Sequence, residues 1–482
     1  MFQPRQSFLP YRPLLERPAS EDAYAMRVTR LGGPARSRGD YVLYWAQGAR
    51  RLEKNLGLNL AIREGNRLSL PVVVYESLRP DYPEANDRIH TFVLQGVSNN
   101  IRDAEARGIR YLFFLPRRKQ DARGVLAKLS NKARLVVTDE YPTFILPGQT
   151  AALADKIKTP LFLVDGNGLL PMRAMPGEQY SAKFFRDKAH RMFPEHWSRL
   201  EDLQPAEDVY RGDLDIEAWD GTDAAGAVKA CDIDHGVPAV FREGGRTAAL
   251  RQLDLFLRER LTGYAALRNR ETNRTSGLSP YLHFGYIGIH EIAERVLFSD
   301  APRLDVDAFL EEAVIRRELS FNMCHFRKDH QSLDVLPDWA KKTLKNHLGD
   351  RRNPQYSFEE MAEARTGDDV WNLSHRGLLV TGTIHNYLRM LWGKRIIEWS
   401  ETPEEAHRTM TKLHDRYAID GRDPNTHAGV LWCFGKHDRA WAPERPIFGM
   451  VRYMSSEATR KKVDLRAYEK SLTEEQNGIV SE

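Results

Sequence analysis

The chain has 482 residues, 41% of them hydrophobic and 29% charged, a composition typical of globular proteins that excludes a disordered or fibrous one. The formal net charge of +4 permits binding to an anionic polymer without requiring it. The longest apolar runs, PVVVY and YLFFLP, are too short to cross a bilayer, and the N-terminus lacks the apolar core of a signal peptide. We therefore expect a cytoplasmic protein without a membrane partner.

The N-terminal third of the chain contains an arm followed by a regular alternation of elements. Residues 1–38 are rich in Pro, Arg and Gly and show little periodicity, which predicts an N-terminal arm. Over residues 39–175, five β-branched or aromatic runs alternate with segments of helical periodicity: YVLYWA, LPVVVYES, IRYLFFLP, ARLVVTDEYP and TPLFLVDG. This alternation predicts an α/β domain with a parallel, doubly wound sheet. No GxGxxG follows the first strand, so the usual dinucleotide fingerprint is absent.

The alternation stops at residue 176, and residues 176–245 are predicted to be an interdomain linker. Over residues 246–482 helical periodicity dominates, which predicts an all-α domain. This domain carries three basic clusters, RNRETNR, KKTLKNHLGDRR and RKKVDLR, which are either solvated helix faces or contacts for phosphates. The three scattered cysteines form no CxxC pair, so neither a disulfide framework nor a metal site is predicted.

Two tryptophans, Trp392 and Trp399, stand seven residues apart in a segment of helical periodicity. Seven residues are close to two helical turns, so the two indoles are expected on nearly the same face of the helix. Core packing and a relay for electrons both explain such a stripe, and the spacing alone does not separate them.

Five motifs follow one another in the helical region: TSGLSPYLHFGYIG, EEAVIRRELSFN, WNLSHRGLLVTGTIHNYLRMLWGKRIIEW, DGRDPN and HDRAWAPERPIFGMVRYM. With these motifs in this order, the chain resembles the class II cyclobutane pyrimidine dimer (CPD) photolyases of the photolyase and cryptochrome superfamily. The resemblance covers the helical region almost throughout and the α/β region in outline. It implies the photolyase/cryptochrome fold, FAD bound in the helical domain, and light-driven repair of pyrimidine dimers in DNA by electron transfer from reduced FAD.

The resemblance also implies a set of cofactor-binding residues. The segment before PYLHFG offers hydroxyls and backbone N–H groups to a diphosphate, although it could equally be a simple helix cap; its members are Thr275, Ser276, Gly277, Leu278 and Ser279. Gly277 stands where relatives often carry a larger polar residue. Tyr264 resembles a tyrosine that lines the cofactor. Arg389 and Asp420 match the ion pair at the N1 and O2 edge of the flavin ring.

Further roles follow from the same resemblance. Asp423 and Asn425 are expected to contact the ring edge or the ribityl chain, although DGRDPN alone would be read as a turn. Three residues are expected to bind the pyrimidine dimer or its backbone: Glu312 beside a pyrimidine carbonyl, Trp432 stacked on the flipped base and Arg316 on a phosphate.

The tryptophans gain a role from the resemblance as well. Trp392, Trp371 and Trp399 match the proximal, intermediate and distal members of the relay that carries an electron to the photoexcited flavin. In the α/β domain, an 8-hydroxy-5-deazaflavin antenna is suggested. The expected partner is DNA containing pyrimidine dimers, and the protein is expected to be a monomer.

Several residues depart from the pattern of the family. His375, Gly377 and Leu378 stand where relatives usually have Gln, Glu and Met, and His427 replaces an aromatic residue. His414 replaces the asparagine that faces flavin N5, which predicts that the redox behaviour of the flavin depends on the protonation of His414. These departures keep two alternatives to repair open: a cryptochrome-like photoreceptor or repurposed flavoprotein without repair activity, and a purely structural DNA-binding role.

Overall fold

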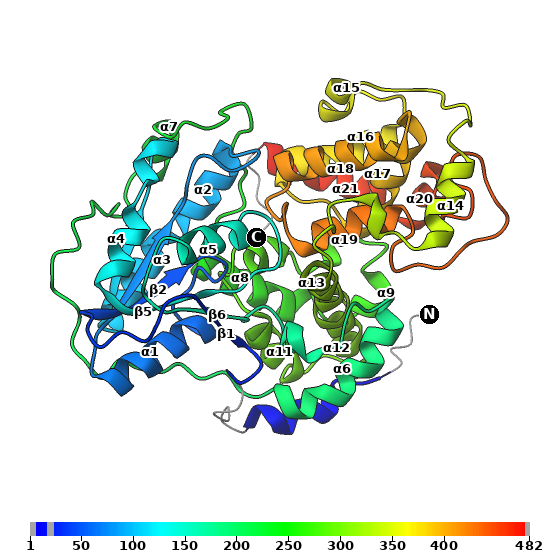
Figure 1. The fold of residues 1–482 in the computed structure, drawn as a ribbon. Coiled ribbons are helices and arrows are strands. Elements are labelled where there is room, and N and C mark those ends of the chain that lie inside the picture. Colours follow the sequence, from blue (N-terminus) through cyan, green and yellow to red (C-terminus); the bar gives the residue numbers. More distant parts are fainter. Residues whose placement is uncertain (1–5, 17–23, 478–482) are drawn as a thin grey trace.

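Two units lie side by side in the computed structural model, a sheet covered by helices and a larger assembly of helices (Figure 1). The structure describes residues 6–16 and 24–477. No helix in these two ranges is long and apolar enough to cross a membrane.

The sheet has six strands in the order β1-β6-β5-β2-β3-β4. In chain order, these are β1 (Val28–Leu31), β2 (Tyr41–Ala46), β3 (Val72–Ser77), β4 (Arg110–Phe114), β5 (Ala133–Asp139) and β6 (Leu161–Val164). All neighbouring pairs are parallel except β1 and β6, which pair antiparallel. The predicted fold class is confirmed, with the correction that the sheet is mixed at one edge.

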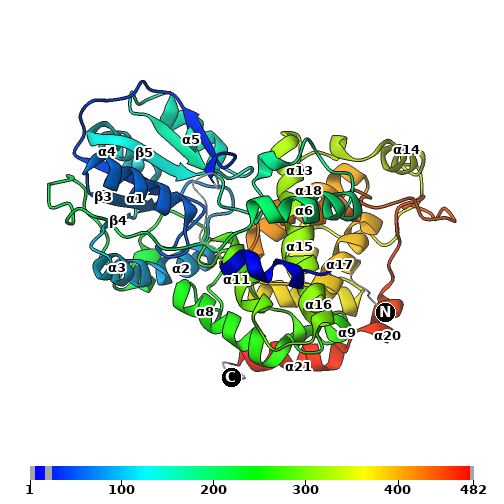
Figure 2. The same cartoon turned by 90° about the horizontal axis from the view of Figure 1, so that it is seen from below.

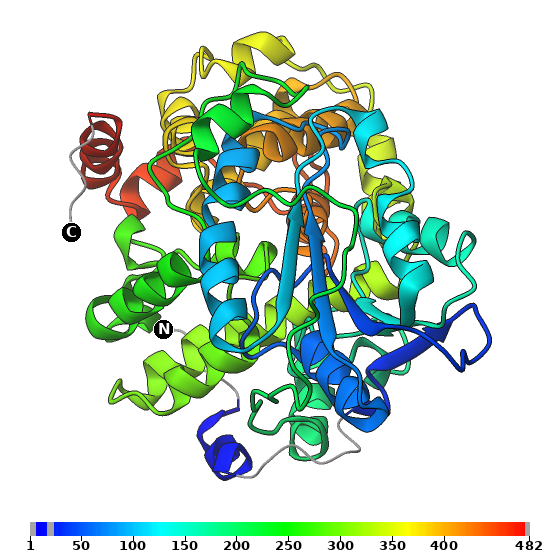
Figure 3. The same cartoon turned by 90° about the vertical axis from the view of Figure 1, so that its left-hand side faces the viewer.

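Helices cover both faces of the sheet (Figure 3). They are α1 (Leu56–Leu68), α2 (Asp87–Gln95), α3 (Val97–Ala106), α4 (Val125–Lys132) and α5 (Leu146–Ala154). Alternate residues of β2 enter different apolar clusters: Val42 and Tyr44 pack on one face, and Leu43 and Trp45 pack on the other. Every residue of β2 is buried, as expected of a central strand covered on both sides.

The segment before residue 39 is more than an arm. Strand β1 extends the sheet at its edge, although its four residues are too few to show a period-two pattern. A short helix, η1 (Leu9–Glu16), lies against the helical unit near α11 (Ile289–Leu297) (Figure 2). Residues 1–5 and 17–23 of the predicted arm lie outside the described residues.

The predicted linker contains two helices, α6 (Ala182–His196) and α7 (Ala224–Lys229). Helix α6 packs against the helical unit, and its buried Phe185, Ala189 and Phe193 recur at helical spacing. Helix α7 packs on α2 of the sheet unit. The segment therefore joins the two units by covering both of them.

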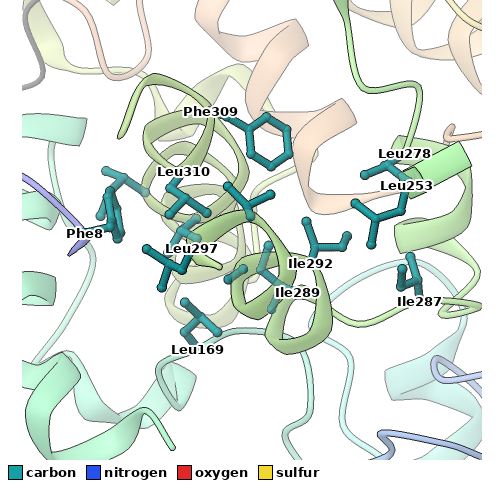
Figure 4. Close-up of a cluster of buried hydrophobic side chains, with 14 of the residues drawn as sticks. Phe8, Leu169, Leu253, Leu278, Ile287, Ile289, Ile292, Leu297, Phe309 and Leu310 are labelled. Carbon is teal, nitrogen blue, oxygen red and sulfur yellow. The ribbon is translucent and has the colours of Figure 1, made fainter. Parts of the chain in front are cut away.

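The helical unit begins at residue 246. Its elements are α8 (Arg246–Leu255), η5 (Phe256–Arg260), α9 (Tyr264–Leu267), η6 (Thr272–Arg274), α10 (Ser279–His283), α11, α12 (Arg303–Leu310), η7 (Glu311–Arg316), α13 (Arg317–Phe326), η8 (Leu333–Val335), α14 (Asp338–Asn346), α15 (Phe358–Ala362), α16 (Asp369–Thr381), α17 (Asn386–Trp399), α18 (Pro403–Tyr417), α19 (Pro424–Cys433), α20 (Ser456–Lys462) and α21 (Leu465–Gln476). One apolar core surrounds α11 and α12 and includes Phe8 and Leu169 from outside the unit (Figure 4). A second core contains the three tryptophans of the predicted relay.

A buried arginine ties the two units together. Arg88 of α2 donates hydrogen bonds to four backbone carbonyls outside the sheet unit, those of Pro238, Leu378, Leu379 and Tyr417. Because a buried guanidinium is costly unless its N–H groups are paired, these bonds fix α2 against α16 and α18.

Candidate cofactor and substrate site

An ion pair joins α17 to the loop before α19. Arg389 Nη2 lies 3.5 Å from Asp420 Oδ2, and Asp420 is 6% exposed. Burial alone would raise the pKa of Asp420, but the charge of Arg389 and a hydrogen bond from Ser279 bring it below its usual value. Asp420 is therefore held as an anion beside a cation.

Three buried polar atoms around this ion pair make no hydrogen bond within the described residues: Asp420 Oδ1, Arg389 Nε and His414 Nε2. Buried polar groups are nearly always satisfied, so these three atoms offer hydrogen-bonding positions that a polar ligand could fill. An acceptor, a donor and an imidazole nitrogen fit the nitrogen- and oxygen-rich edge of a flavin ring.

The predicted diphosphate segment leads into α10. Gly277 adopts a left-handed conformation with φ of +66°, which favours glycine at this position. The carbonyls of Ser276 and Gly277 accept hydrogen bonds from Gln252 Nε2 at 2.7 Å and Arg242 Nη1 at 3.3 Å, which anchors the turn. Leu278 is buried in the apolar core, so it can offer a ligand only its backbone.

Asp423 makes several hydrogen bonds within the protein, and its predicted contact with the cofactor stays a prediction. Its Oδ1 accepts from the backbone N–H and the side chain of Asn425, and its Oδ2 accepts from the Tyr141 hydroxyl at 2.7 Å and from His283 Nδ1 at 3.1 Å. Both carboxylate oxygens are thus engaged within the protein. Asp423 caps α19 and fastens it to the sheet unit, and it orients the amide of Asn425, for which contact with a ligand stays a prediction.

His414 lies on α18 beside the ion pair and is 1% exposed. Burial, reinforced by the charge of Arg389, lowers the pKa of His414 to about 3. The imidazole is therefore neutral at physiological pH. This low pKa contradicts the prediction that the protonation of His414 controls the flavin. The sequence alone could not show it, because the burial of His414 depends on the fold.

Replacement of His414 by asparagine is expected to leave the pH profile of flavin photoreduction unchanged. A group whose pKa lies at about 3 does not change its charge between about pH 6 and 8. Photoreduction followed by absorption across this range, in the wild type and in His414→Asn, measures the effect. A step in the profile that only the wild type shows would contradict this account.

The three tryptophans lie in one series of ring contacts. Trp371 on α16 stacks with Trp392 at a centroid distance of 6.4 Å and meets Trp399 edge-on at 5.3 Å, so Trp371 lies between the other two. Its Nε1 donates to the Trp392 carbonyl at 3.0 Å. Since all three rings also belong to a buried apolar core, the geometry suits a relay and core packing alike.

Glu312, Arg316 and Trp432 come together as predicted for a substrate site. Glu312 and Arg316 lie on η7, a π-helical turn between α12 and α13, a feature frequent at functional sites. Glu312 Oε1 lies 2.9 Å from Arg268 Nη1 and 3.4 Å from Arg316 Nε. The guanidinium of Arg316 in turn lies 5.3 Å from the centroid of the Trp432 ring.

A cavity of about 200 Å³ adjoins this cluster, and its wall combines three basic side chains with one acidic, two aromatic and two methionine side chains. Its lining residues are Asn269, Tyr387, Met390, Lys394, Trp432, Asp438, Arg452, Met454 and Lys462. Burial lowers the pKa of Lys394 to about 8. Apart from Trp432, the sequence analysis did not single out these lining residues, although Asn269 and Lys462 lie in two of its basic clusters.

A larger cavity of about 600 Å³ lies at the carboxyl ends of the parallel strands, where ligands of α/β sheets commonly bind. Its wall combines Trp45 and Tyr75 of the sheet unit with His283, Phe284 and Arg422 of the helical unit. A ligand in this cavity would therefore contact both units.

Solved structures with known folds define the fold of this chain. The cryptochrome from Synechocystis sp. has a TM-score of 0.67 at 16% identity, covering 92% of this chain and 93% of that one. An archaeal photolyase from Sulfolobus tokodaii, solved with two FAD molecules, has a TM-score of 0.66 at 15% identity, covering 90% and 92%. This chain has the photolyase and cryptochrome fold.

Relatives in sequence specify the family. The deoxyribodipyrimidine photo-lyase of Methanothermobacter thermautotrophicus is 38% identical over 449 residues, 92% of this chain and 97% of that protein. The protein of that name from Arabidopsis thaliana is 31% identical over 440 residues, 89% of this chain and 88% of that one. The chain belongs to the deoxyribodipyrimidine photo-lyase family. No protein-family model matches the sequence.

Proposed function

We propose that this protein binds FAD and uses light to repair cyclobutane pyrimidine dimers in DNA. The observation that carries the proposal is the placement of two clusters on neighbouring helices. The Arg389–Asp420 ion pair has unpartnered polar atoms suited to a flavin, and Glu312, Arg316 and Trp432 meet beside a basic cavity. The names of the relatives support repair, so neither the photoreceptor nor the structural alternative is favoured.

Bound and reduced FAD would supply the electron that splits the dimer. In this proposal, Arg389 and Asp420 hold the polar edge of the ring, and Tyr264 and the hydroxyls of residues 275–279 hold the rest of the cofactor. Glu312 lies beside a pyrimidine carbonyl, the Trp432 ring stacks on the flipped base and Arg316 binds a backbone phosphate. Trp371, Trp392 and Trp399 would carry electrons to the bound cofactor.

The finer assignments are also proposals. The motif order and the spacing of Trp371, Trp392 and Trp399 support class II. The cavity of about 600 Å³ supports an antenna chromophore, for which the resemblance suggests an 8-hydroxy-5-deazaflavin. We propose a cytoplasmic monomer with an α/β domain from Val28 to residue 175, a connecting segment to residue 245 and a helical FAD-binding domain from residue 246.

The direct test is illumination of the reduced, FAD-loaded protein with dimer-containing single- and double-stranded DNA. Recovery of intact pyrimidines in the light, and none in the dark, is the expected result. Protein that holds FAD and binds the lesion but restores no pyrimidines under illumination would refute the repair function.

Replacement of Glu312 by glutamine is expected to lower the yield of repair about tenfold or more, because the neutral amide loses the ion pairs with Arg268 and Arg316 that orient this side chain in the proposed substrate site. FAD content should stay unchanged, since Glu312 pairs with Arg268 and Arg316 instead of the Asp420 cluster. Repair yield per absorbed photon measures the effect, with the exposed Glu259→Gln as the matched control. Equal yields of repair in the two variants would show that Glu312 is not part of the substrate site.

A further inference from the structure

His375 is hydrogen-bonded within the tryptophan series. It lies on α16 one turn after Trp371 and is 0% exposed. Its Nε2 lies 3.1 Å from the Ala362 carbonyl, and its Nδ1 accepts from Trp392 Nε1 at 3.2 Å. A carbonyl only accepts and an indole only donates, so the proton of the neutral imidazole is on Nε2 and the lone pair on Nδ1 faces the Trp392 N–H.

The rings around this bond are nearly parallel. The His375 and Trp392 planes differ by 4°, and His375 stacks on Trp371 at 5.1 Å with planes 8° apart. Tyr417 meets the imidazole edge-on at 5.7 Å. Among the described residues, no acidic or basic side chain forms an ion pair or a hydrogen bond with the imidazole, and its hydrogen-bond partners are Trp392 Nε1 and the Ala362 carbonyl.

We propose that His375 Nδ1 accepts the indole proton of Trp392 when Trp392 loses an electron. The inference rests on the proposed function, in which photoexcited oxidised FAD takes that electron. The electron leaves the indole ring, the Nε1–H bond breaks, and its proton forms a bond to Nδ1. Trp392 becomes a neutral radical, His375 becomes an imidazolium, and the positive charge of the pair is unchanged.

Electrostatics favours this transfer inside a dry core. Burial lowers the pKa of His375 to about 4, so the imidazole is a free base at physiological pH. Creating a new charge there would be costly, but the oxidised indole is already a buried cation, and the proton only moves that charge by one hydrogen bond. The imidazolium keeps its bond to Ala362 and lies on the face of Trp371, where a cation is attracted to the aromatic ring.

The transfer would delay loss of the separated charge. An indole that has lost its proton is a weaker oxidant than the indole radical cation, and it must regain the proton before its ground state is restored. His375 thereby acts on the reacting nitrogen of the relay, in place of the glutamine usual in relatives, whose amide hydrogen-bonds but is hardly basic.

The test uses flash excitation of the FAD-loaded, oxidised protein in a Trp371→Phe background, where the oxidised indole cannot pass its charge onward. With His375 present, the transient spectrum should change from the indole radical cation to the neutral radical, and more slowly in D₂O. With His375→Gln added, the cation should persist until it recombines, and recombination should be about tenfold faster or more. His190→Gln, another buried histidine bonded to an aromatic residue, is the matched control.

A second measurement needs no light. Nitrogen NMR of histidine-labelled protein, assigned by the signal lost in His375→Gln, should show the tautomer with its proton on Nε2. A proton on Nδ1, or identical transients with histidine and glutamine, would overturn the proposal. Absence of any tryptophan radical in FAD-loaded Trp371→Phe protein would instead refute the relay of the proposed function, and protein that takes up no FAD would refute its cofactor.

Discussion

Replacement of Trp392 by phenylalanine is expected to slow photoreduction of the oxidised flavin by about a hundredfold or more, an increase of about 3 kcal/mol in the effective barrier. Phenylalanine fills most of the space of the indole but is much harder to oxidise. The substitution also removes the hydrogen bond from Trp392 Nε1 to His375 Nδ1. Absorption under continuous light measures the rate, and the FAD content of the purified protein should change little.

The control for this variant is Trp219→Phe, which changes a tryptophan that packs on Phe113 in the sheet unit. Repair by chemically reduced protein should survive in both variants, because the electron for repair then does not pass through Trp392. Undiminished photoreduction in Trp392→Phe would mean that the three buried indoles are packing residues only.

Replacement of Arg389 by alanine is expected to reduce FAD content at least about tenfold, because Asp420 then remains as a buried anion without its cation. Removing one partner of a buried ion pair leaves an unpaired charge and lowers the free energy of unfolding by several kcal/mol. We expect a smaller loss of about 2 kcal/mol here, because Arg389 is partly exposed. Flavin absorbance per chain and thermal unfolding measure the two effects. Asp420→Asn together with Arg389→Ala should regain part of the stability but none of the FAD.

The matched control is Arg395→Ala, which removes another arginine of α17 that pairs with Asp368 and Glu398 in the C-terminal half of the helix. The Arg395→Ala substitution should lower the thermal stability of the protein and leave its FAD content unchanged. If Arg389→Ala retains a full complement of FAD, the ion pair with Asp420 is structural and the polar edge of the ring lies elsewhere.

Much of the architecture could be predicted because the local signals are strong. The central strands are continuous apolar runs buried on both faces, and the long helices repeat their apolar residues at helical spacing. Strand β1 could not be predicted, since Val28–Leu31 pairs with β6, which lies far along the chain, and only that pairing makes it a strand. Helix α6 does carry a periodic apolar pattern, a local signal that is sufficient to predict a helix within the segment 176–245.

The candidate site was predictable where a motif implied a role and unpredictable where a role depends on neighbours. Glu312 and Trp432 lie far apart in sequence, yet both meet Arg316. The sequence could not show that Asp423 joins α19 to other parts of the chain, because its hydrogen-bond partners, Tyr141 and His283, lie far away in sequence. For the same reason, His375 was noted only as a departure, since its bond to Trp392 requires α16 and α17 to be packed side by side.

The four carbonyls held by Arg88 bear on how light energy would travel through the molecule. Transfer of excitation between two chromophores depends steeply on their separation and on the angle between their transition dipoles. A chromophore in the cavity of about 600 Å³ would contact both units, so its orientation toward the flavin would be set by the interface that Arg88 fastens. Loosening this interface would therefore lower the efficiency of energy transfer to the flavin, and it would also disturb the cavity wall that both units supply.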